Sequence, residues 1–242
     1  MKLLLIRHAD PDYEHDSLTP VGEREAEYLA EYLENREITA FYCSPLGRAR
    51  CTAEHTLRRM GREAEIHDFL REFEIRIDRD GTGQGKIPWD MLPDVWTAEP
   101  SYFDPERWTQ VPVMAAADMA REAARVYEGI DGLLARHGYV REGKIYRAQR
   151  PNEETIAVFC HFGVTALMLA HILSVSPMVL WHGMVSAPSS ITTLVTEERR
   201  MGVASLRMTG FGETPHLALH GEAPSFSARF CERYTNWDQR HD

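Results

Sequence analysis

The sequence has little of what marks membrane, disulfide-rich or metal-binding proteins. None of its 242 residues fall in a run of about 18 apolar residues, the length that spans a membrane. The apolar run before the charged pair Arg7-His8 consists of Leu3–Ile6 alone, which is too short for a secretory signal. The four cysteines form no CxxC pair and the histidines show no HExxH spacing. We therefore expect a cytoplasmic protein with no membrane association, no metal site and no other cofactor.

An excess of positive charge is also missing. The chain has 27 Lys and Arg against 37 Asp and Glu, a formal net charge of -10. Binding to a nucleic-acid backbone needs a basic surface, so nucleic acid is not an expected partner. A small phosphorylated molecule remains an expected partner, because a few cationic side chains in a cleft set the local potential there. The sequence gives no indication of the oligomeric state.

Buried strands and amphipathic helices alternate along most of the chain. Continuous or alternating apolar runs predict strands at 3–6, 40–43, 64–69, 155–160, 190–196 and 203–208. Helices are expected from Pro20, after Ser44-Pro45-Leu46, over 114–137 and over 164–173, with a small hairpin at 139–150. This order predicts an α/β fold, a three-layer α/β/α sandwich with a mainly parallel sheet. No linker divides the chain, so residues 1–242 are expected to form one domain.

Residues 73–112 interrupt this pattern. They are rich in Gly, Pro, Trp and Asp and have no sustained period, which predicts an irregular insertion with short helices. Long loops of this kind are often functional lids. Their aromatic residues either wall a substrate pocket or form a small core of the insertion itself: Trp89, Trp96, Tyr102, Phe103 and Trp108.

Two of the predicted strands end in a histidine. His8 follows the strand at 3–6 and His161 follows the strand at 155–160. Because ligands bind where parallel strands end, we expect both to lie close together, with Arg7 and Arg48 beside them. Guanidinium groups match phosphoryl oxygens with paired hydrogen bonds, and a neutral imidazole is a nucleophile near neutral pH. The pattern predicts a site that handles a phosphoryl group without a metal ion.

Five segments, in order, resemble motifs of the histidine phosphatase (phosphoglycerate mutase-like) superfamily. They are Arg7-His8, Leu18-Thr19-Pro20-Val21-Gly22, the stretch from Ser44 to Ala53 (SPLGRARCTA), Leu70-Arg71-Glu72 and Cys160-His161-Phe162-Gly163. The resemblance covers residues 3–72 and 155–196 well and extends little over 73–150 or the C-terminal tail. It implies a phosphoglycerate mutase-like fold.

The resemblance also implies a role for each matching residue. His8 would be the nucleophile that becomes phosphorylated, and Arg7, Arg48 and His161 would hold the phosphoryl oxygens, helped by the Phe162 N–H. Glu72 would protonate the leaving oxygen and then activate water, which a carboxylic acid of raised pKa can do. Two assignments have rivals in the sequence itself, since Arg50 competes with Arg48 and Glu74 competes with Glu72.

The sequence departs from the family pattern around the first histidine. Ala9-Asp10 replace the common Gly-Glu, and the asparagine that often helps to bind phosphate a few residues later is absent. Three residues are candidates to shape that loop instead: Asp12, Tyr13 and His15. Further along the chain, Ser189-Ser190 stand where the family often has an asparagine.

We therefore expect a metal-independent phosphatase that hydrolyses a phosphomonoester through a phosphohistidine at His8. One alternative is a phosphoglycerate mutase, which must hold a second phosphate. The stretch FEIRIDRDGTG after Glu72 lacks the basic, aromatic-rich run of such mutases, although Arg76 and Arg79 leave that alternative open. The other alternative is a non-catalytic sensor of a phosphorylated ligand, against which the intact set of His8, His161 and arginines argues.

Overall fold

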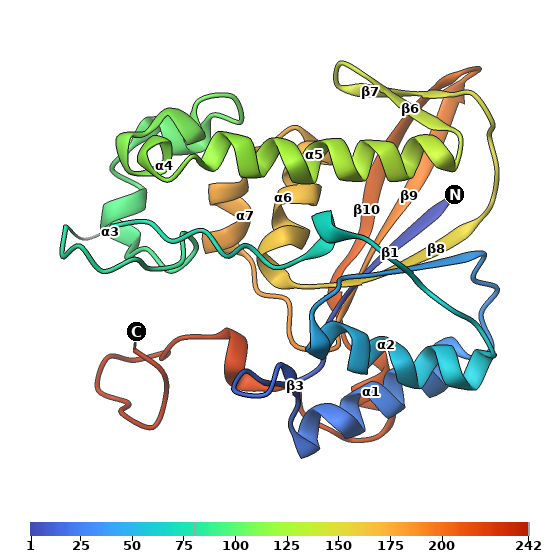
Figure 1. Cartoon of the computed structure of the whole chain (residues 1–242), viewed down its shortest axis with the longest axis horizontal. Coiled ribbons are helices and arrows are strands. Elements are labelled where there is room, and N and C mark those ends of the chain that lie inside the picture. Colours follow the sequence, from blue (N-terminus) through green and yellow to red (C-terminus); the bar gives the residue numbers. More distant parts are fainter. Residues whose placement is uncertain (80, 242) are drawn as a thin grey trace.

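Strand β1 (Lys2–Arg7) lies inside an eight-stranded sheet of order β5-β4-β8-β1-β9-β10-β7-β6. The computed structural model describes residues 1–79 and 81–241 (Figure 1). The other strands of this sheet are β4 (Ala40–Cys43), β5 (Glu65–Ile66), β6 (Tyr139–Glu142), β7 (Ile145–Ala148), β8 (Thr155–Cys160), β9 (Ile191–Arg200) and β10 (Val203–Glu213). A separate two-stranded ladder pairs β2 (Pro11–Asp12) with β3 (Ser17–Leu18).

The half of the sheet that carries the two histidines is parallel. β5, β4, β8 and β1 pair in parallel, and the remaining strands are added as antiparallel neighbours through β9. Each neighbour from β9 to β6 runs opposite to the one before it. As a result, β10 and β6 run in the same direction as β1. The predicted sheet is confirmed in its parallel core, and the far half makes it a mixed sheet.

Helices cover both faces of the sheet and complete three layers (Figure 1). One face carries α1 (Pro20–Leu33) and α2 (Gly47–Met60); the other carries α5 (Met119–Arg136), α6 (Phe162–Leu173) and α7 (Pro177–Gly183). Three short helices complete the set: α3 (Pro93–Trp96), α4 (Pro112–Ala116) and α8 (Pro215–Leu219). None of the helices in the described residues is long and apolar enough to cross a membrane.

Alternate residues of β1 face the two helical layers. Leu3 and Leu5 belong to the larger core under α5, α6 and α7, whereas Leu4 and Ile6 belong to the core under α1 and α2. A strand covered on both faces has no polar face, which explains why β1 reads as one apolar run. The same reasoning holds for β8, where Ile156 and Ala157 point to opposite cores.

Two predicted elements differ from the structure. The strand expected at 64–69 is only Glu65–Ile66, because the chain then turns into a 3-10 helix over Asp68–Leu70 that buries Phe69 against α5. Gly129 of α5 makes this packing possible, since a Cβ there would lie 2.2 Å from the Phe69 ring. β5 lies at the edge of the sheet and pairs only with β4, so no second neighbouring strand stabilises a longer β5.

The helix expected at 114–137 is also interrupted. It is divided into α4 and α5 at Asp118, whose φ of 52° is left-handed. In one continuous helix Met114 and Met119 would point about 140° apart, because successive side chains turn by about 100°. The break lets both methionines be fully buried.

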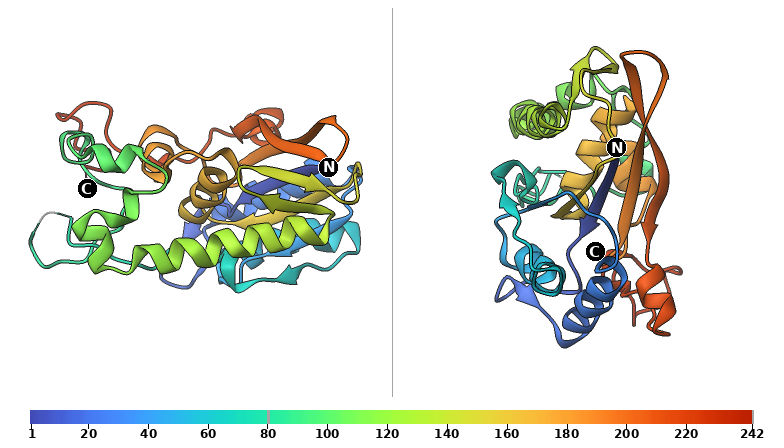
Figure 2. Two further views of the ribbon diagram at one scale, coloured as in Figure 1. Left: turned by 90° about the horizontal axis from the view of Figure 1, so that it is seen from above. Right: turned by 90° about the vertical axis from the view of Figure 1, so that its right-hand side faces the viewer.

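The insertion is as irregular as its composition predicts. Its described residues, 73–79 and 81–112, contain α3, the 3-10 turns Pro100–Phe103 and Trp108–Gln110, and an isolated bridge between Ile77 and Lys86. The C-terminal segment, which follows α8, extends toward the insertion at the end of the molecule away from the N-terminus (Figures 1 and 2). An ion pair between Arg240 and Asp90 joins the two segments.

Candidate active site

Strand register brings the two histidines to one edge of the sheet. Arg7 pairs with Cys160 at the ends of β1 and β8, so His8 and His161 follow at the same level. Their ring centroids lie 5.1 Å apart. A cavity of about 1190 Å³ opens at this edge, lined at its inner end by Arg7, His8, Arg48, Glu72 and Phe162. His161 is fully buried beside His8 and is not among the residues that line the cavity.

The His8 ring has a defined tautomer. Its Nδ1 lies 2.8 Å from the carbonyl oxygen of Ala9, and a carbonyl only accepts, so Nδ1 carries the hydrogen. Nε2 is therefore the nitrogen with a free lone pair. Burial, followed by the charges of Arg7 and Arg48, holds the pKa of His8 well below its ordinary value. The ring is neutral near pH 7 and can act as a nucleophile.

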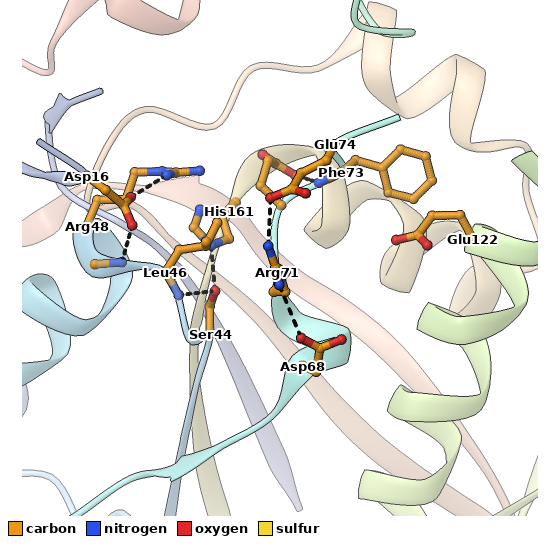
Figure 3. A network of polar contacts seen from close by, with 12 residues as sticks. Asp16, Ser44, Leu46, Arg48, Asp68, Arg71, Phe73, Glu74, Glu122 and His161 are labelled. Carbon is orange, nitrogen blue, oxygen red and sulfur yellow. Dashed lines mark hydrogen bonds and ion pairs between the residues drawn. The ribbon is translucent and has the colours of Figure 1, made fainter. Parts of the chain in front are cut away.

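His161 is held by Ser44. The Ser44 hydroxyl lies 2.8 Å from His161 Nε2 and accepts a hydrogen bond from the Leu46 N–H at 3.2 Å (Figure 3). His161 Nδ1 is buried and has no partner among the described residues. Burial and the neighbouring His8 and arginines lower the pKa of His161, so its ring is neutral near pH 7.

Both arginines are anchored through one nitrogen. Arg7 Nη1 donates to the Ser186 carbonyl oxygen at 2.6 Å, and Arg48 Nη1 donates to Asp16 Oδ1 at 2.6 Å (Figure 3). The Nε atoms of both arginines are buried without a hydrogen-bond partner in the described chain. Buried N–H groups are rarely left unpaired in native proteins. These groups are thus donors that an oxyanion in the cavity can satisfy.

Glu72 caps the start of α6. Oε1 accepts from the N–H groups of Phe73 (2.9 Å) and Val164 (3.0 Å), and Oε2 accepts from the Gly163 N–H (3.1 Å). Burial raises the pKa of Glu72, against the opposing effect of these three hydrogen bonds. A Cβ at Gly163 would lie 2.7 Å from Oε1, so this position requires glycine. The Phe162 N–H makes no hydrogen bond within the described residues.

The position of each side chain distinguishes Arg48 from Arg50 and Glu72 from Glu74. Arg48 lines the cavity, while Arg50 is exposed and absent from its wall. Glu74 also lines the cavity, but it is exposed and bonds with Arg71 at 2.8 Å (Figure 3). The geometry therefore favours Arg48 and Glu72 for the roles considered from sequence.

The three loop candidates after His8 are split. Tyr13 lines the cavity, and Arg48 lies 5.5 Å from the centre of its ring. Asp12 and His15 bind each other at 2.8 Å outside the cavity wall. Farther along the chain, Ser189 and Ser190 are both buried and do not line the cavity either. Among these residues, only Tyr13 contributes to the wall.

The insertion supplies part of the outer wall. Trp89 and Trp96 line the cavity, whereas Tyr102 and Trp108 are buried in the core and Phe103 is 47% exposed. Some of the predicted aromatic residues therefore line the cavity, and others are buried in the core. The C-terminal segment completes the wall with Ser227, Arg229, Phe230, Cys231, Tyr234, Arg240 and His241.

The sequence profile of the histidine phosphatase superfamily (branch 1) matches residues 3–209, which include all the residues at the inner end of the cavity. The chain belongs to the histidine phosphatase superfamily. A curated relative is Phosphoserine phosphatase 1 of Hydrogenobacter thermophilus, 26% identical over 219 residues that cover 86% of this chain and 93% of the relative.

Solved structures of the superfamily share the fold. A mutant phosphoserine phosphatase from Entamoeba histolytica in complex with phosphoserine aligns with a TM-score of 0.60 at 19% identity, covering 89% of this chain and 98% of its own. A mycobacterial glucosyl-3-phosphoglycerate phosphatase in complex with VO3 aligns with a TM-score of 0.58 at 20% identity, covering 87% of this chain and 98% of its own. At this identity the likeness establishes the fold.

Three groups that hold the site residues in place have no motif in the sequence that assigns them this role. Asp16 holds Arg48, Ser44 holds His161 and the Ser186 carbonyl holds Arg7. Ser44 lies within a motif, but its contact with His161 crosses 117 residues and has no signal in the sequence. Within residues 1–79 and 81–241, no three His, Cys, Asp or Glu side chains are grouped as metal ligands.

Proposed function

We propose that this chain hydrolyses a phosphomonoester through a phosphohistidine at His8, with no requirement for a metal ion. The observation that carries the proposal is the state of His8. Its Nδ1–H is bound to the Ala9 carbonyl and its ring is neutral, which leaves Nε2 as a free nucleophile on the cavity wall. A nucleophile of this kind divides a difficult displacement into two easier steps.

In the first step, His8 Nε2 attacks phosphorus. The N–P bond forms as the bond from phosphorus to the ester oxygen breaks, and Glu72 in its acid form gives its proton to that oxygen. Arg7, Arg48 and His161 Nδ1 donate to the non-bridging oxygens, whose charge the guanidinium forks match. The Ala9 carbonyl accepts from Nδ1–H throughout and stabilises the positive charge that develops on the ring.

In the second step, water attacks the phosphohistidine. The Glu72 carboxylate takes a proton from the water as the new O–P bond forms and the N–P bond breaks. The electron pair of the broken bond returns to His8 Nε2, and inorganic phosphate leaves. Glu72 is protonated again and ready for the next ester, as a raised pKa favours.

The charges on the outer wall give a mutase little support. A mutase must hold a second phosphate with further cations, and two of the outer arginines are neutralised in place. Arg229 is paired with Glu232, and Arg240 is paired with Asp90. Hydrolysis is therefore favoured over transfer between two phosphate positions.

The proposal is tested with 4-nitrophenyl phosphate in the presence of EDTA. We expect the wild type to release phosphate, His8→Ala to fall to background, and His15→Ala to retain activity because its side chain is 70% exposed outside the cavity. A phosphoenzyme that is acid-labile and alkali-stable should be trapped in the wild type and in His15→Ala, but not in His8→Ala.

Three results would contradict the proposal in different ways. Activity lost with EDTA and restored by a divalent ion would overturn metal independence. A phosphoenzyme that forms but transfers its phosphate only to an alcohol would indicate a mutase. No activity together with no phosphoenzyme would indicate a non-catalytic sensor.

A further inference from the structure

The cavity extends far beyond the groups that face a phosphoryl unit. Its volume of about 1190 Å³ is larger than the usual range for pockets that hold drug-sized ligands, about 300–1,000 Å³. The walls outside the phosphoryl end are rich in large apolar side chains, among them Phe73, Trp89, Met91, Trp96, Phe162 and Trp181. A three-carbon phosphoester would leave most of this surface in contact with water.

The apolar surface begins directly beside the phosphoryl-binding groups. The Arg7 guanidinium lies 6.0 Å from the centre of the Phe162 ring, and the Phe162 ring lies 6.5 Å from Trp89 in an edge-to-face arrangement. Trp89 also packs against Gly163 next to Glu72, since a Cβ at Gly163 would lie 2.7 Å from both the Trp89 ring and Glu72 Oε1. An ester oxygen that takes its proton from Glu72 would therefore extend its carbon body toward Trp89.

The rings are held in place before any ligand binds. Trp181 is buried and donates its Nε1–H to the Gly163 carbonyl oxygen at 3.1 Å, and its ring centroid lies 5.8 Å from that of Trp89. Trp96 stacks on His182 at 4.9 Å, and His182 is fixed by a 2.8 Å hydrogen bond to the Met178 carbonyl oxygen. A rigid aromatic wall binds an apolar group with little further loss of conformational entropy.

Charge on the outer wall offers little for a carboxylate. Arg229 and Arg240 are paired with Glu232 and Asp90. Arg76 lines the cavity without an ion pair among residues 1–79 and 81–241, but its side chain is exposed. For the carboxylate of a small substrate, Arg76 would be a partner that stays exposed to solvent.

We propose that the alcohol part of the substrate is a bulky apolar group, aromatic rather than ionic, that packs on Trp89 and Phe162. The proposal rests on the proposed phosphatase activity of the same site. It separates this chain from its relatives whose named substrates are phosphoserine and a glucosylated phosphoglycerate. The transferred group is the same in all of them, and the part of the substrate that is released differs.

The test compares three phosphate monoesters of primary alcohols, namely 3-phenylpropyl phosphate, propyl phosphate and phosphoserine. All three leaving oxygens need a proton, so differences in kcat/KM report mainly on how the enzyme binds the alcohol part of each ester. We expect kcat/KM for the phenylpropyl ester to exceed that for the propyl ester by about tenfold or more, because a phenyl ring is buried. Phosphoserine should be no better than propyl phosphate.

Two tryptophan variants localise the effect. Trp89→Ala should reduce the phenylpropyl-to-propyl ratio toward one, and Trp89→Leu should leave an intermediate ratio; the ratio cancels any effect on Glu72. Met201→Ala is the control, because that side chain is 95% exposed and is not on the cavity wall. Its ratio should equal that of the wild type.

Three outcomes overturn the inference while leaving the phosphatase intact. They are a phenylpropyl-to-propyl ratio near one in the wild type, a ratio unchanged by Trp89→Ala, and a preference for phosphoserine that Arg76→Gln removes. Absence of hydrolysis of all three esters, with no phosphoenzyme, would instead overturn the proposed function on which the inference rests.

Discussion

The hydroxyl oxygen of Ser44 lies 2.8 Å from Nε2 of His161, so Nδ1 is the ring nitrogen that has no partner among the described residues (Figure 3). Ser44 already accepts a hydrogen bond from Leu46 N–H and has no other acceptor among the described residues for its own hydrogen. If the hydroxyl donates to Nε2, the hydrogen of the neutral imidazole must be on Nδ1. The buried, unpartnered Nδ1 is then a donor toward a phosphoryl oxygen.

Ser44→Ala should therefore lower kcat by about tenfold, the equivalent of one lost hydrogen bond of about 1.4 kcal/mol. The cause would be a redistribution of His161 between its two tautomers. The ¹⁵N chemical shifts of the His161 ring measure that distribution directly. Ser205→Ala, an exposed serine on β10, is the control. An altered kcat with unaltered ring shifts would show that Ser44 does not act through the tautomer.

Asp16 orders Arg48 and should control affinity for phosphate. It accepts from Arg48 Nη1 and from the Gly47 N–H, each at 2.6 Å. Burial works to raise the pKa of Asp16, but these hydrogen bonds leave it below its ordinary value, so the ion pair persists at neutral pH. We expect Asp16→Ala to raise the inhibition constant of inorganic phosphate by about tenfold, as loss of one charge-assisted hydrogen bond would.

The matched control for Asp16 is Asp12→Asn, since Asp12 binds only His15 and local backbone N–H groups outside the cavity. Its inhibition constant should match that of the wild type. Equal affinity for phosphate in Asp16→Ala and the wild type would mean that Arg48 keeps its position without the carboxylate.

Glu72→Gln should affect substrates according to the basicity of the leaving group. An alkoxide cannot leave without a proton, whereas 4-nitrophenolate is stable enough to leave unprotonated. General acid catalysis contributes about 10²–10⁴-fold, so we expect a loss in that range with propyl phosphate and a much smaller loss in phosphoenzyme formation with 4-nitrophenyl phosphate. Pre-steady-state release of alcohol measures the first step for each ester.

Glu74→Gln is the natural comparison for Glu72→Gln. Glu74 is exposed and bonded to Arg71, and its loss should change neither ester by more than about twofold, the size of a weak surface ion pair. If Glu74→Gln rather than Glu72→Gln impairs the alkyl ester selectively, the proton donor has been assigned to the wrong carboxyl.

Glu25 makes stability depend on pH. Its side chain is buried, and burial raises its pKa from 4.5 to about 7 although the Asp10 N–H donates to one oxygen. Because the folded state disfavours the ionised form, stability is lost as pH rises from about 4.5 through 7. The loss is on the order of 3 kcal/mol, since one pKa unit corresponds to about 1.36 kcal/mol.

Glu25→Gln removes the ionisation while keeping an acceptor for the Asp10 N–H. The free energy of unfolding, measured in urea, should therefore fall between pH 5 and pH 8 in the wild type and change less in Glu25→Gln. The stability of the variant relative to the wild type should increase as pH rises. Glu37→Gln, at an exposed position, should follow the wild type. A difference between Glu25→Gln and wild type that is constant across this range would contradict the raised pKa.

The sequence alone was sufficient for the elements that are buried on both faces or have clear end signals. β1 and β8 were recognisable because a strand covered by two layers is continuously apolar. The start of α1 was recognisable because Thr19 caps it and Pro20 lacks the N–H that would need a partner. The extent of β5 was predicted wrongly, because it depends on the packing of Phe69 against α5. The break at Asp118 was not predicted, because it depends on the burial of both Met114 and Met119.

For the site, the sequence by itself determined which reactive side chains are present, and the tertiary structure decided how they are arranged. Motif order was enough to propose His8, Arg48 and His161 as site residues, because each is tied to a strand end or a helix start. Choosing Glu72 over Glu74 needed the three N–H groups that bind its carboxylate, two of them at the start of α6 about 90 residues away. The supporting contacts of Asp16 and Ser44, and the C-terminal segment on the cavity wall, join residues distant in sequence. A local pattern carries no trace of such contacts, since they are selected by packing in space.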